Sequence, residues 1–437
     1  MNKYFKSFDK TKSIEGKIFV PEKYSDLKKI DANGKYIPRG AGLSYSAASM
    51  GANVVSIDMT YFNRILSFDK EIGTIEVESG TRIGFLNNFL VKHHWTIPAL
   101  PGYPSITVGG CVGFNVHGKS QFKQGVFGDC VEGIKIFHPI YGIIECSREQ
   151  QKDLFDLTIG GMGFTGLIIS VTLKLVPVKG NRLMTKKIFT ESLEETIEQM
   201  IKGAKEYEYL YSWNDVNIKG KNFGRGILHQ EEILDGFGEN EVIKYKNRLQ
   251  FKLPFRKLHN SLSIVLMNRI YYAAARMGGS KSKEVAFEKG AFPIFGKEVY
   301  FYLFGNKGFR EYQVIIPFNF WELAVEAIRA YLNKKSIPVT LCSLKIFKGD
   351  KHNLSFVQDG VCLTFDVLNN KKSIEFFEFL DAISIKYEGI INLSKDSRVS
   401  AETVKALFKG YDQFKQALNS FDSNKIFTSE IRERLEL

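Results

Sequence analysis

The sequence predicts an α+β protein with two domains, and three observations lead to this prediction. The chain has 437 residues, 44% of them hydrophobic, which is more than a single core usually holds. Up to about residue 178, short strand-like segments alternate with turns and glycine-rich loops. Beyond that point amphipathic helices alternate with strands, a pattern typical of helices that pack on an antiparallel sheet.

The elements of the first half follow from the hydrophobic pattern. Residues 74–80, TIEVESG, alternate between apolar and polar and end in glycine, as a half-buried strand does. Thr81 is predicted to cap a helix over 82–95, which has apolar residues three and four apart. The other elements expected here are strands at 54–58 and 65–69, a hairpin at 133–147, and a short helix, a glycine loop and a strand over 153–178.

Capping signals mark the helices of the second half. Ser192 with Glu195 forms a capping box for a helix that reaches about residue 205. Asn319 with Glu322 gives the same signal for 320–335. The remaining elements expected are a helix that Ser373 begins, over 374–387, and strands at 310–317, 339–347 and 360–367.

Charge and cysteine content limit the class of protein. The formal charge of +12 points to an anionic partner, such as phosphate groups or an acidic membrane surface, unless it only reflects a solvated lysine-rich surface. Nucleic acid is disfavoured because the lysines are dispersed and no nucleic-acid-binding motif is present. The five cysteines form no CxxC pair and no zinc spacing. We expect reduced thiols, no metal site, no spanning helix, no secretory signal and a cytoplasmic location that could include the inner membrane face.

The segment 244–284 combines basic and large apolar residues without a cleanly repeating polar face. Contact with a membrane surface or a lipid is one interpretation. A buried connection between strands is the other, and the sequence favours it.

Three glycine-rich segments carry the main functional signal. They are PRGAGLSYS at 38–46, TVGGCVGFNVHG at 107–118 and TIGGMGFTG at 158–166. A backbone without Cβ atoms lets N–H groups point at an anion and lets a flat ligand lie on the main chain. Three such segments indicate one long ligand, which a dinucleotide fits better than a mononucleotide. Neither the Rossmann fingerprint nor a P-loop is present.

These segments, with SIDMTYFNRI, VESGTRIGFL and LPGYPS, resemble the FAD domain of the vanillyl-alcohol oxidase/p-cresol methylhydroxylase (PCMH) superfamily. The motifs NVHGKS, YSWND, EYQVIIP, SLKIFKG and LSKDSRVSAET resemble, more narrowly, its decaprenylphosphoryl-β-D-ribose 2'-oxidase group. The resemblance implies a two-domain PCMH-type fold. Its parts would be an FAD-binding domain at 1–178, a substrate (cap) domain at 179–390 built on an antiparallel sheet with helices, and a segment at 391–437 that returns to the FAD domain.

The resemblance also implies how FAD is held. Leu43 stands where many members of the superfamily carry the histidine that tethers the flavin, so we expect non-covalent FAD; Cys111 is the nearest cysteine to the second tether position. The expected FAD contacts are Arg39, Gly40, Ala41, Gly42, Leu43 and Ser44, then Gly109, Gly110, Val112, Gly113, Asn115 and His117, then Gly161, Gly163, Thr165 and Ile168, and finally Lys395.

Oxidation of an alcohol needs a hydride acceptor, a base for the hydroxyl proton and positive charge near the reduced flavin. The resemblance places Lys395, Lys345, His117 and Tyr45 in the catalytic site, with the base left open among the last three. Substrate contacts are expected from Gln313, Lys119, Cys362, Trp213 and Glu311. Lys119 is equally compatible with a phosphate contact and with an exposed side chain, Cys362 and Trp213 are also compatible with plain packing, and Glu311 replaces a glutamine expected at that position.

The resemblance predicts an FAD-dependent oxidoreductase that acts on CH–OH groups. It would oxidise the 2'-hydroxyl of a polyprenyl-phosphate pentose to a keto sugar, and a short-chain dehydrogenase partner would complete the epimerisation, in cell wall or polysaccharide biosynthesis. One alternative is a soluble aldonolactone or alditol oxidase that uses a small free sugar and oxygen. Another is a flavin-binding subunit without turnover of its own. Peripheral membrane contact is compatible with the first of these.

Overall fold

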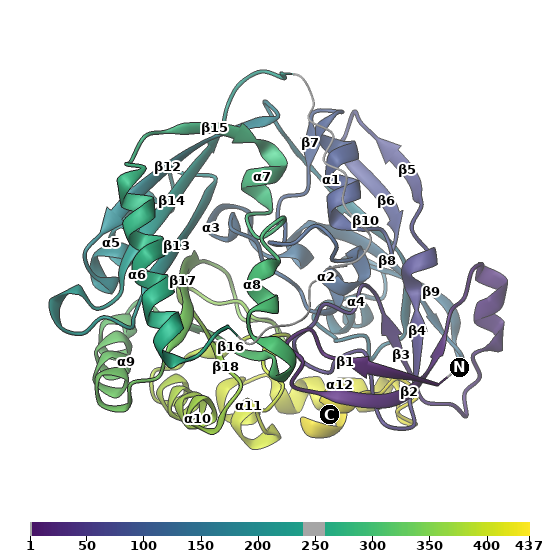
Figure 1. Cartoon of the computed structure of the whole chain (residues 1–437). Helices are drawn as coiled ribbons and strands as arrows, with labels where there is room; N and C mark the ends of the chain where they lie inside the picture. The colour runs from purple at the N-terminus through teal and green to yellow at the C-terminus, as the bar shows by residue number, and fades with distance from the viewer. Residues whose placement is uncertain (1, 239–257) are drawn as a thin grey trace.

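The computed structural model describes residues 2–238 and 258–437. The strands before residue 178 in the sequence form one group of sheets, and those after it form another (Figure 1). The first group has a four-stranded sheet, a five-stranded sheet and a two-stranded ribbon. In sheet order, the strands are β1 Asn2–Lys6, β2 Ser13–Phe19, β4 Val55–Asp58 and β3 Tyr36–Arg39; then β5 Ile65–Asp69, β6 Thr74–Glu78, β10 Leu167–Lys174, β8 Val131–His138 and β9 Gly142–Ser147; then β11 Val176–Pro177 and β7 Trp95–Thr96.

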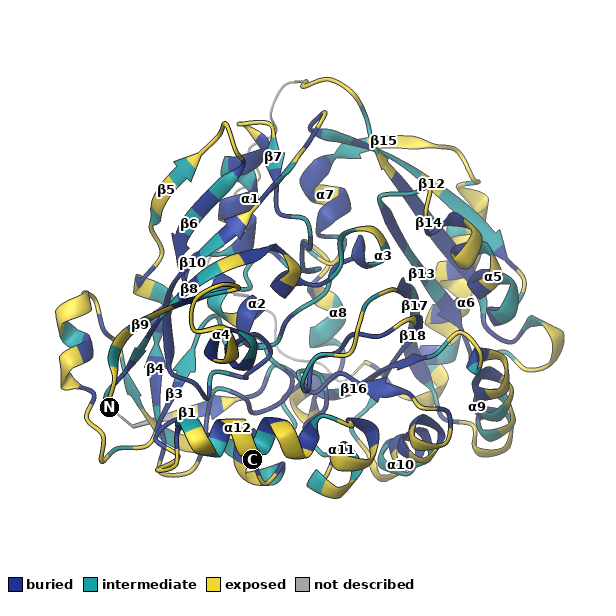
Figure 2. Ribbon diagram, turned by 180° about the vertical axis from the view of Figure 1, so that it is seen from behind, coloured by how far each residue is buried: buried dark blue, intermediate teal, exposed yellow. Residues whose placement is uncertain are grey.

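The second group is one eight-stranded antiparallel sheet. Its strands in order are β15 Lys283–Ala286, β12 Arg182–Thr190, β14 Arg225–Ile233, β13 Tyr209–Asp215, β17 Val339–Phe347, β18 Gly360–Leu368, β16 Phe309–Ile316 and β19 Ile390–Ile391. Helices α5 Leu193–Gly203, α9 Trp321–Lys335 and α10 Lys371–Lys386 cover one face. The largest hydrophobic core lies between these helices and the sheet (Figure 2). The α+β class and the two-domain arrangement of the fold are confirmed.

Short helices complete the first part of the chain. They are α1 Ile83–Val91, α2 Val108–Gly113, α3 Gln121–Gln124 and α4 Lys152–Thr158. Helices α1 and α2 pack with the five-stranded sheet around a second core. The strands and the hairpin expected at 54–80 and 133–147 are present as β4, β5, β6, β8 and β9.

A segment with three helices lies along the eight-stranded sheet, and its later part also contacts the first part of the chain. It contains α6 Ser261–Met277, α7 Phe287–Ala291 and α8 Val299–Tyr302. Helix α6 packs on β17, and α7 packs on β12 and β15. From the other side, Tyr103 Oη donates to Glu298 Oε1 at 3.0 Å, and the Phe8 ring meets Phe301 edge-on at 4.9 Å. The segment therefore covers the face of the eight-stranded sheet that α5, α9 and α10 leave free.

The C-terminal helices bring the end of the chain back to the first sheet. They are α11 Ala401–Leu407, α12 Tyr411–Phe421 and α13 Glu430–Arg434. The Tyr36 amide donates to Ile426 O at 2.8 Å, and the Thr428 amide donates to Tyr36 O at 2.9 Å. Residues 426–428 thus lie alongside β3. The domain limits themselves stay a prediction.

Three predicted helix starts differ in the structure. The N-cap of α1 is Arg82, not Thr81, and the helix ends at Val91. The N-cap of α9 is Phe320, since its amide closes a turn on Pro317 O. Helix α10 begins earlier than expected, because the Asn370 side chain accepts from the Ser373 amide. For α1 and α9 a preceding turn, which short motifs do not encode, sets the first helical residue, whereas for α10 an earlier side-chain cap sets it. The Ser192 cap of α5 is present: its hydroxyl accepts from the Glu195 amide.

Part of the segment 244–284 lies outside the described residues. The remainder contains α6, which is packed on the sheet along one side and exposes apolar side chains along the other. Across residues 2–238 and 258–437, no helix has both the length and the hydropathy to cross a bilayer. All five cysteines are buried, and none is in a disulfide.

Candidate active site

The three glycine-rich segments meet in space. The Gly160 amide donates to Val112 O at 2.9 Å, and the Met162 amide donates to Gly113 O at 2.7 Å, so the second and third segments are joined. A Cβ at Gly163 would collide with Pro38 of the first segment, and a Cβ at Gly40 would collide with the Thr107 side chain. The separate glycine signals of the sequence therefore form one surface.

The second segment is a short helix rather than an open loop. Thr107 caps α2, because its hydroxyl accepts a hydrogen bond from the Gly110 amide at 3.3 Å. Gly109, Gly110 and Gly113 are helical residues. Gly110 is exposed, and a Cβ at Gly113 would meet only Gly163 N, at 3.8 Å. The helix is therefore bare on the side that faces the third segment.

Backbone amides in these segments suit FAD. Within the described parts of the chain, the amides of Ala41, Gly42 and Leu43 donate no hydrogen bond, and neither does that of Gly163. Gly42 and Gly163 have φ values of +67° and +83°, which favour glycine. Free amides beside bare backbone can receive phosphate oxygens and the edge of a flat ring. The residues present therefore fit the cofactor.

Several side chains expected on FAD are instead engaged within the protein. Arg39 donates to Ser49 Oγ at 2.8 Å and packs under Gly42. Asn115 accepts from the Gly128 amide at 2.7 Å and donates to Ser355. The other engaged residues are Ser44, bonded to Ser394 O; Gly109, whose amide donates to Ser79 O; Gly161, whose amide donates to Thr158 O; Thr165, bonded to Thr158; and Val112 and Ile168, in the second core. These residues shape the segments, and their contact with FAD stays a prediction.

Strand register explains how the candidate catalytic side chains come together. Gln313 of β16 lies opposite Thr364 of β18, and Lys345 of β17 lies opposite Cys362 of β18. Because side chains alternate between the faces of a sheet, these four residues share one face. Tyr312, the residue before Gln313, points to the other face, because its hydroxyl donates to Asp381 of α10. The four residues therefore lie on the face opposite the helix-covered core.

His117 connects the glycine segments to this face. Its Nε2 lies 3.4 Å from Gln313 Oε1, and its Nδ1 lies 3.4 Å from Gly118 O. Gln313 also accepts from Asn392 at 2.6 Å and donates to Thr364 at 3.1 Å. Burial, and then the charge of Lys345, lower the pKa of His117 to about 3, so that the imidazole is neutral near pH 7.

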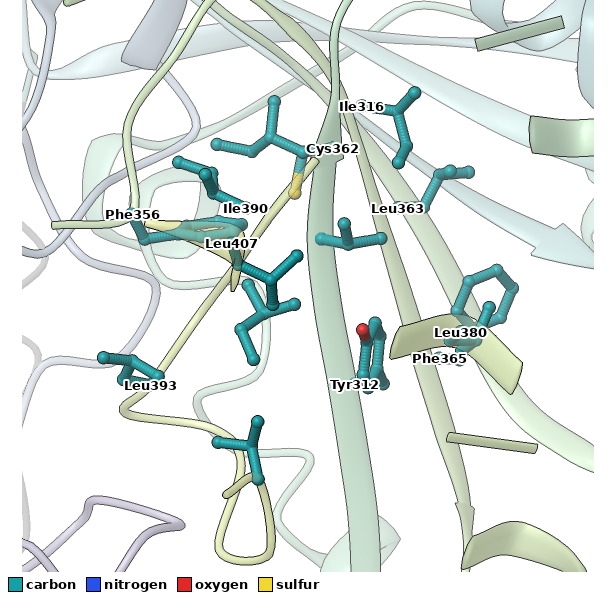
Figure 3. Close-up of a cluster of buried hydrophobic side chains, with 14 of the residues drawn as sticks. Tyr312, Ile316, Phe356, Cys362, Leu363, Phe365, Leu380, Ile390, Leu393 and Leu407 are labelled. Carbon is teal, nitrogen blue, oxygen red and sulfur yellow. The ribbon is translucent and has the colours of Figure 1, made fainter. Parts of the chain in front are cut away.

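Lys345 lies in the middle of the face without a partner of its own. Among the described residues its ammonium makes no ion pair or hydrogen bond, although its charge affects both His117 and Cys362. Burial raises the pKa of the Cys362 thiol to about 11, so the thiol stays protonated. Figure 3 shows Cys362 on the side of Phe356 and Ile390, whereas Leu363 and Phe365 point to the opposite side of the strand.

Lys395 and Tyr45 form the other end of the site. Lys395 Nζ lies 3.7 Å from the centre of the Tyr45 ring and 3.4 Å from Glu311 Oε1. The Tyr45 amide donates to Ser394 O at 3.0 Å, which fixes the two residues side by side. Burial and then the charge of Glu311 hold the pKa of Tyr45 well above its usual value, so Tyr45 keeps its proton.

Lys119 is paired with a carboxylate inside the protein, and its contact with a substrate phosphate stays a prediction. It is buried, 3.5 Å from Glu231 Oε2, and its ammonium lies over the rings of Tyr209 and Tyr211. Tyr211 also donates to Glu231 at 3.1 Å and stacks on His229, with the two rings 1° from parallel. The expectation of an exposed side chain is wrong, because β14 supplies a buried carboxylate as its counter-ion.

Trp213 contacts α6. Its ring meets Tyr271 at 4.8 Å, edge to face, and it lies on β13 two residues from Tyr211. Trp213 therefore lies on the same face of the sheet as the Lys119 group.

Several residues of the site were not predicted from the sequence. They are Glu231, Tyr211 and His229 near Lys119, and Thr364, Asp366, Asn392 and Tyr300 near Gln313 and Glu311. The alternation of polar residues in RGILHQEEI and GVCLTFDV was the available signal. It marks an unusually polar strand face, but it does not say which strands are neighbours.

Comparison with known proteins agrees with this geometry. Residues 21–147 match the family described as FAD binding domain. The chain is 27% identical to decaprenylphosphoryl-β-D-ribose oxidase of Mycolicibacterium smegmatis, over 92% of this chain and 89% of the relative. It is 30% identical to L-gulonolactone oxidase of Mus musculus over 35% of this chain and 34% of that enzyme. It is also 24% identical to L-galactono-1,4-lactone dehydrogenase of Brassica oleracea, over 44% and 32%.

The two lactone enzymes therefore match over about a third of their own length, whereas the ribose oxidase matches through both parts of this chain. The PCMH-type resemblance and the FAD cofactor expected from the sequence are confirmed. The chain is an FAD-dependent oxidoreductase with a PCMH-type FAD-binding domain, similar over nearly its whole length to decaprenylphosphoryl-β-D-ribose oxidase.

Proposed function

We propose that the protein oxidises the 2'-hydroxyl of a polyprenyl-phosphate pentose to a keto sugar. The observation that carries this proposal is the Lys345 ammonium, which lies on a polar face near His117 and has no partner in the described part of the chain. A partly buried cation without a counter-ion costs free energy, which an anionic ligand would offset. Similarity to the ribose oxidase across both parts of the chain supports a substrate that also contacts the eight-stranded sheet.

A row of polar residues supports a place for the phosphate. In the sheet register Lys187 of β12 lies opposite His229, and His229 lies opposite Tyr211. Since Asn214 of β13 pairs antiparallel with Cys342 of β17, continuing this register brings Tyr211 opposite Lys345. The row leads from Lys345 toward Lys187, about three strand spacings of ~4.8 Å away. A sugar beside Lys345 would direct its phosphate along this row.

The chain's own residues supply what the reaction needs besides the hydride acceptor, which is FAD. Lys395 would hold positive charge beside the cofactor. Tyr45 keeps its proton, so it is unsuited to be the base. The neutral His117 imidazole can accept a hydrogen bond from the hydroxyl, but its pKa of about 3 makes it a weak base, so the base stays open between His117 and Lys345. Gln313 and Asn392 hold His117 in position.

Non-covalent attachment of FAD is part of the proposal. Leu43 has no nucleophile, and Cys111 is fully buried in the second core, with burial raising the pKa of its thiol well above the usual value. Acid precipitation of the purified protein is expected to release all flavin absorbance into the supernatant. Flavin that stays with the pellet would contradict this.

Helix α6 supports peripheral contact with a membrane. Leu262, Leu266, Ile270 and Met277 are all more than half exposed, and exposed basic residues follow the helix at Lys281 and Lys283. An apolar stripe beside cations is the pattern of an interfacial helix. Such a contact would bring a lipid-borne sugar next to the sheet face that α6 covers. Flotation with anionic vesicles is expected for the native protein, and reduced flotation for L266E, with L323E on the exposed side of α9 as the matched control.

The decisive experiment compares two substrates under anaerobic conditions. Farnesylphosphoryl-β-D-ribose is expected to bleach the flavin band, and L-gulono-1,4-lactone is expected to leave it unchanged. K345M should slow bleaching by at least about tenfold, which corresponds to about 1.4 kcal/mol. The reverse preference would favour the second candidate function, a small-sugar or lactone oxidase, which the partial similarity to two lactone enzymes supports.

The keto product needs a further step if the sugar is to be epimerised. A hydride donor must reduce the ketone from the other face, and a short-chain dehydrogenase partner is the enzyme class we propose. Adding such a partner with its reduced nicotinamide cofactor should convert the bleaching product to the 2'-epimer.

A further inference from the structure

Two buried carboxyl groups face each other at the end of the site. Glu311 of β16 and Asp366 of β18 lie opposite each other in the antiparallel register, and they are 6% and 1% exposed. Side chains in this relation are about 5 Å apart at Cβ. Both point to the same face as Gln313 and Thr364, toward Lys395.

Among the described residues, Lys395 is the one cation that serves the two carboxyls. Lys395 Nζ lies 3.4 Å from Glu311 Oε1. Asp366 receives one neutral donor instead: Tyr300 Oη donates to its Oδ2 at 2.8 Å, and Tyr300 in turn contacts Thr340. Asp366 Oδ1 is buried and has no hydrogen-bond partner among the described residues. A fully buried carboxylate would not leave an oxygen unpartnered, whereas a carboxylic acid can use that oxygen as a donor.

Within residues 2–238 and 258–437, the other neighbours of the two carboxyls supply no second positive charge. Tyr45 and Tyr300 are neutral, because burial and the acidic neighbours raise the pKa of each phenol. Asp9 acts on Tyr45, and the thiols of Cys342 and Cys362 are neutral groups that feel the charge of Asp366 and Glu311. Arg310 precedes Glu311 in β16, and its side chain donates to Asn369 Oδ1. Burial and the Glu311 charge raise the pKa of Asp366 well above its usual value.

We propose that Glu311 and Asp366 share one proton, so that Asp366 is a neutral acid that donates to Glu311 and Glu311 is the single carboxylate counter-ion of Lys395. Glu311 is then a positioning residue, since it holds the Lys395 ammonium beside Tyr45. The inference concerns the charge of the site and goes beyond the substrate proposed above.

Two isosteric variants separate the alternatives, because an asparagine at 366 copies the shape and charge of the protonated acid. The infrared spectrum of the native holoenzyme near pH 7, minus that of D366N, is expected to show the carbonyl stretch of a protonated carboxylic acid. This band should shift to lower frequency in D2O. D366N should lose this band. E78Q is the matched control, because Arg64 and Tyr24 bind the buried Glu78 carboxylate, which lowers its pKa; the band should remain in that variant.

The reduction potential of bound FAD gives a second readout. E311Q removes a negative charge beside Lys395 and should raise the potential, whereas D366N should leave it unchanged. Circular dichroism and thermal unfolding verify that each variant is folded. Absence of the band from the native protein, or equal shifts of potential in both variants, would mean that both carboxyls are ionised. Persistence of the band in D366N would place the proton on another group, and either result would overturn the proposal. The infrared test uses no sugar, so its failure is distinct from failure of the substrate proposal.

Discussion

Gly113→Ala is expected to stabilise the protein and to weaken FAD binding, two effects of opposite sign. A Cβ at Gly113 would lie 3.8 Å from Gly163 N, an ordinary van der Waals distance, and its φ is not in the left-handed region. Alanine in place of glycine at a helical position stabilises by up to about 1 kcal/mol. The same methyl group would cover the Gly163 amide, which must be accessible if it donates a hydrogen bond to FAD.

The binding loss follows from that geometry. If the amide donates one hydrogen bond to a charged phosphate or to the flavin edge, losing it costs about 1.5–3 kcal/mol, or about 10- to 100-fold in the dissociation constant. FAD titration of the apoprotein, followed by flavin fluorescence, measures this, and urea unfolding of the apoprotein measures stability. Gly133→Ala in β8 is the matched control, because its Cβ would have neighbours at the same 3.8 Å distance. An unchanged FAD affinity in Gly113→Ala would refute the placement of FAD against the Gly113 and Gly163 backbone.

Three further predictions concern buried charges. K119M should destabilise the protein by about 3–5 kcal/mol, because Glu231 is left unpaired, and K119M/E231Q should recover most of this in urea unfolding; a double variant no better than the single one would contradict it. His117 has a folded pKa of about 3, below the unfolded value of ~6.5, so the unfolded chain binds the extra proton and stability falls as pH drops from 6.5 to 3. In H117Q, up to about 4 kcal/mol of this pH-dependent loss of stability should disappear, which unfolding free energies measured at a series of pH values would show. An unaltered pH profile would count against a neutral imidazole. D422N should cost about 3–5 kcal/mol in the same assay, because Arg432 loses its partner at 3.1 Å deep in the protein; a cost within error of zero would contradict this.

Local patterns predict the strands of this fold well and the helix starts less well. Alternation and β-branched residues give β6, β17 and β18 to within a few residues, because both report burial on a sheet. Caps depend on the backbone just before the helix. Asn319 and Thr81 have suitable side chains, but turns at Pro317 and Glu78 shift the helical geometry by a residue. A motif cannot encode that shift.

The same distinction applies to the site. Lys345, His117, Gln313, Lys395 and Tyr45 were all found by motif, and the structure brings them together. Asp366 and Glu231 were missed because their importance depends on register. Each becomes significant only when segments more than 50 residues apart in the sequence come together and place it opposite Glu311 or beside Lys119.

The segment after β19 explains why the site needs both ends of the chain. Strand β19 pairs with β16 through Val314 and Ile391, which allows the Asn392 amide to bond Gln313 O at 2.9 Å. Two residues later, the Ser394 carbonyl accepts from the amides of Tyr45 and Ser46. One short turn is thus bonded to the substrate sheet on one side and to the first glycine segment on the other. Since Lys395 follows directly, its ammonium is positioned by both parts at once, and a shift of either part relative to the other would move the charge away from Glu311.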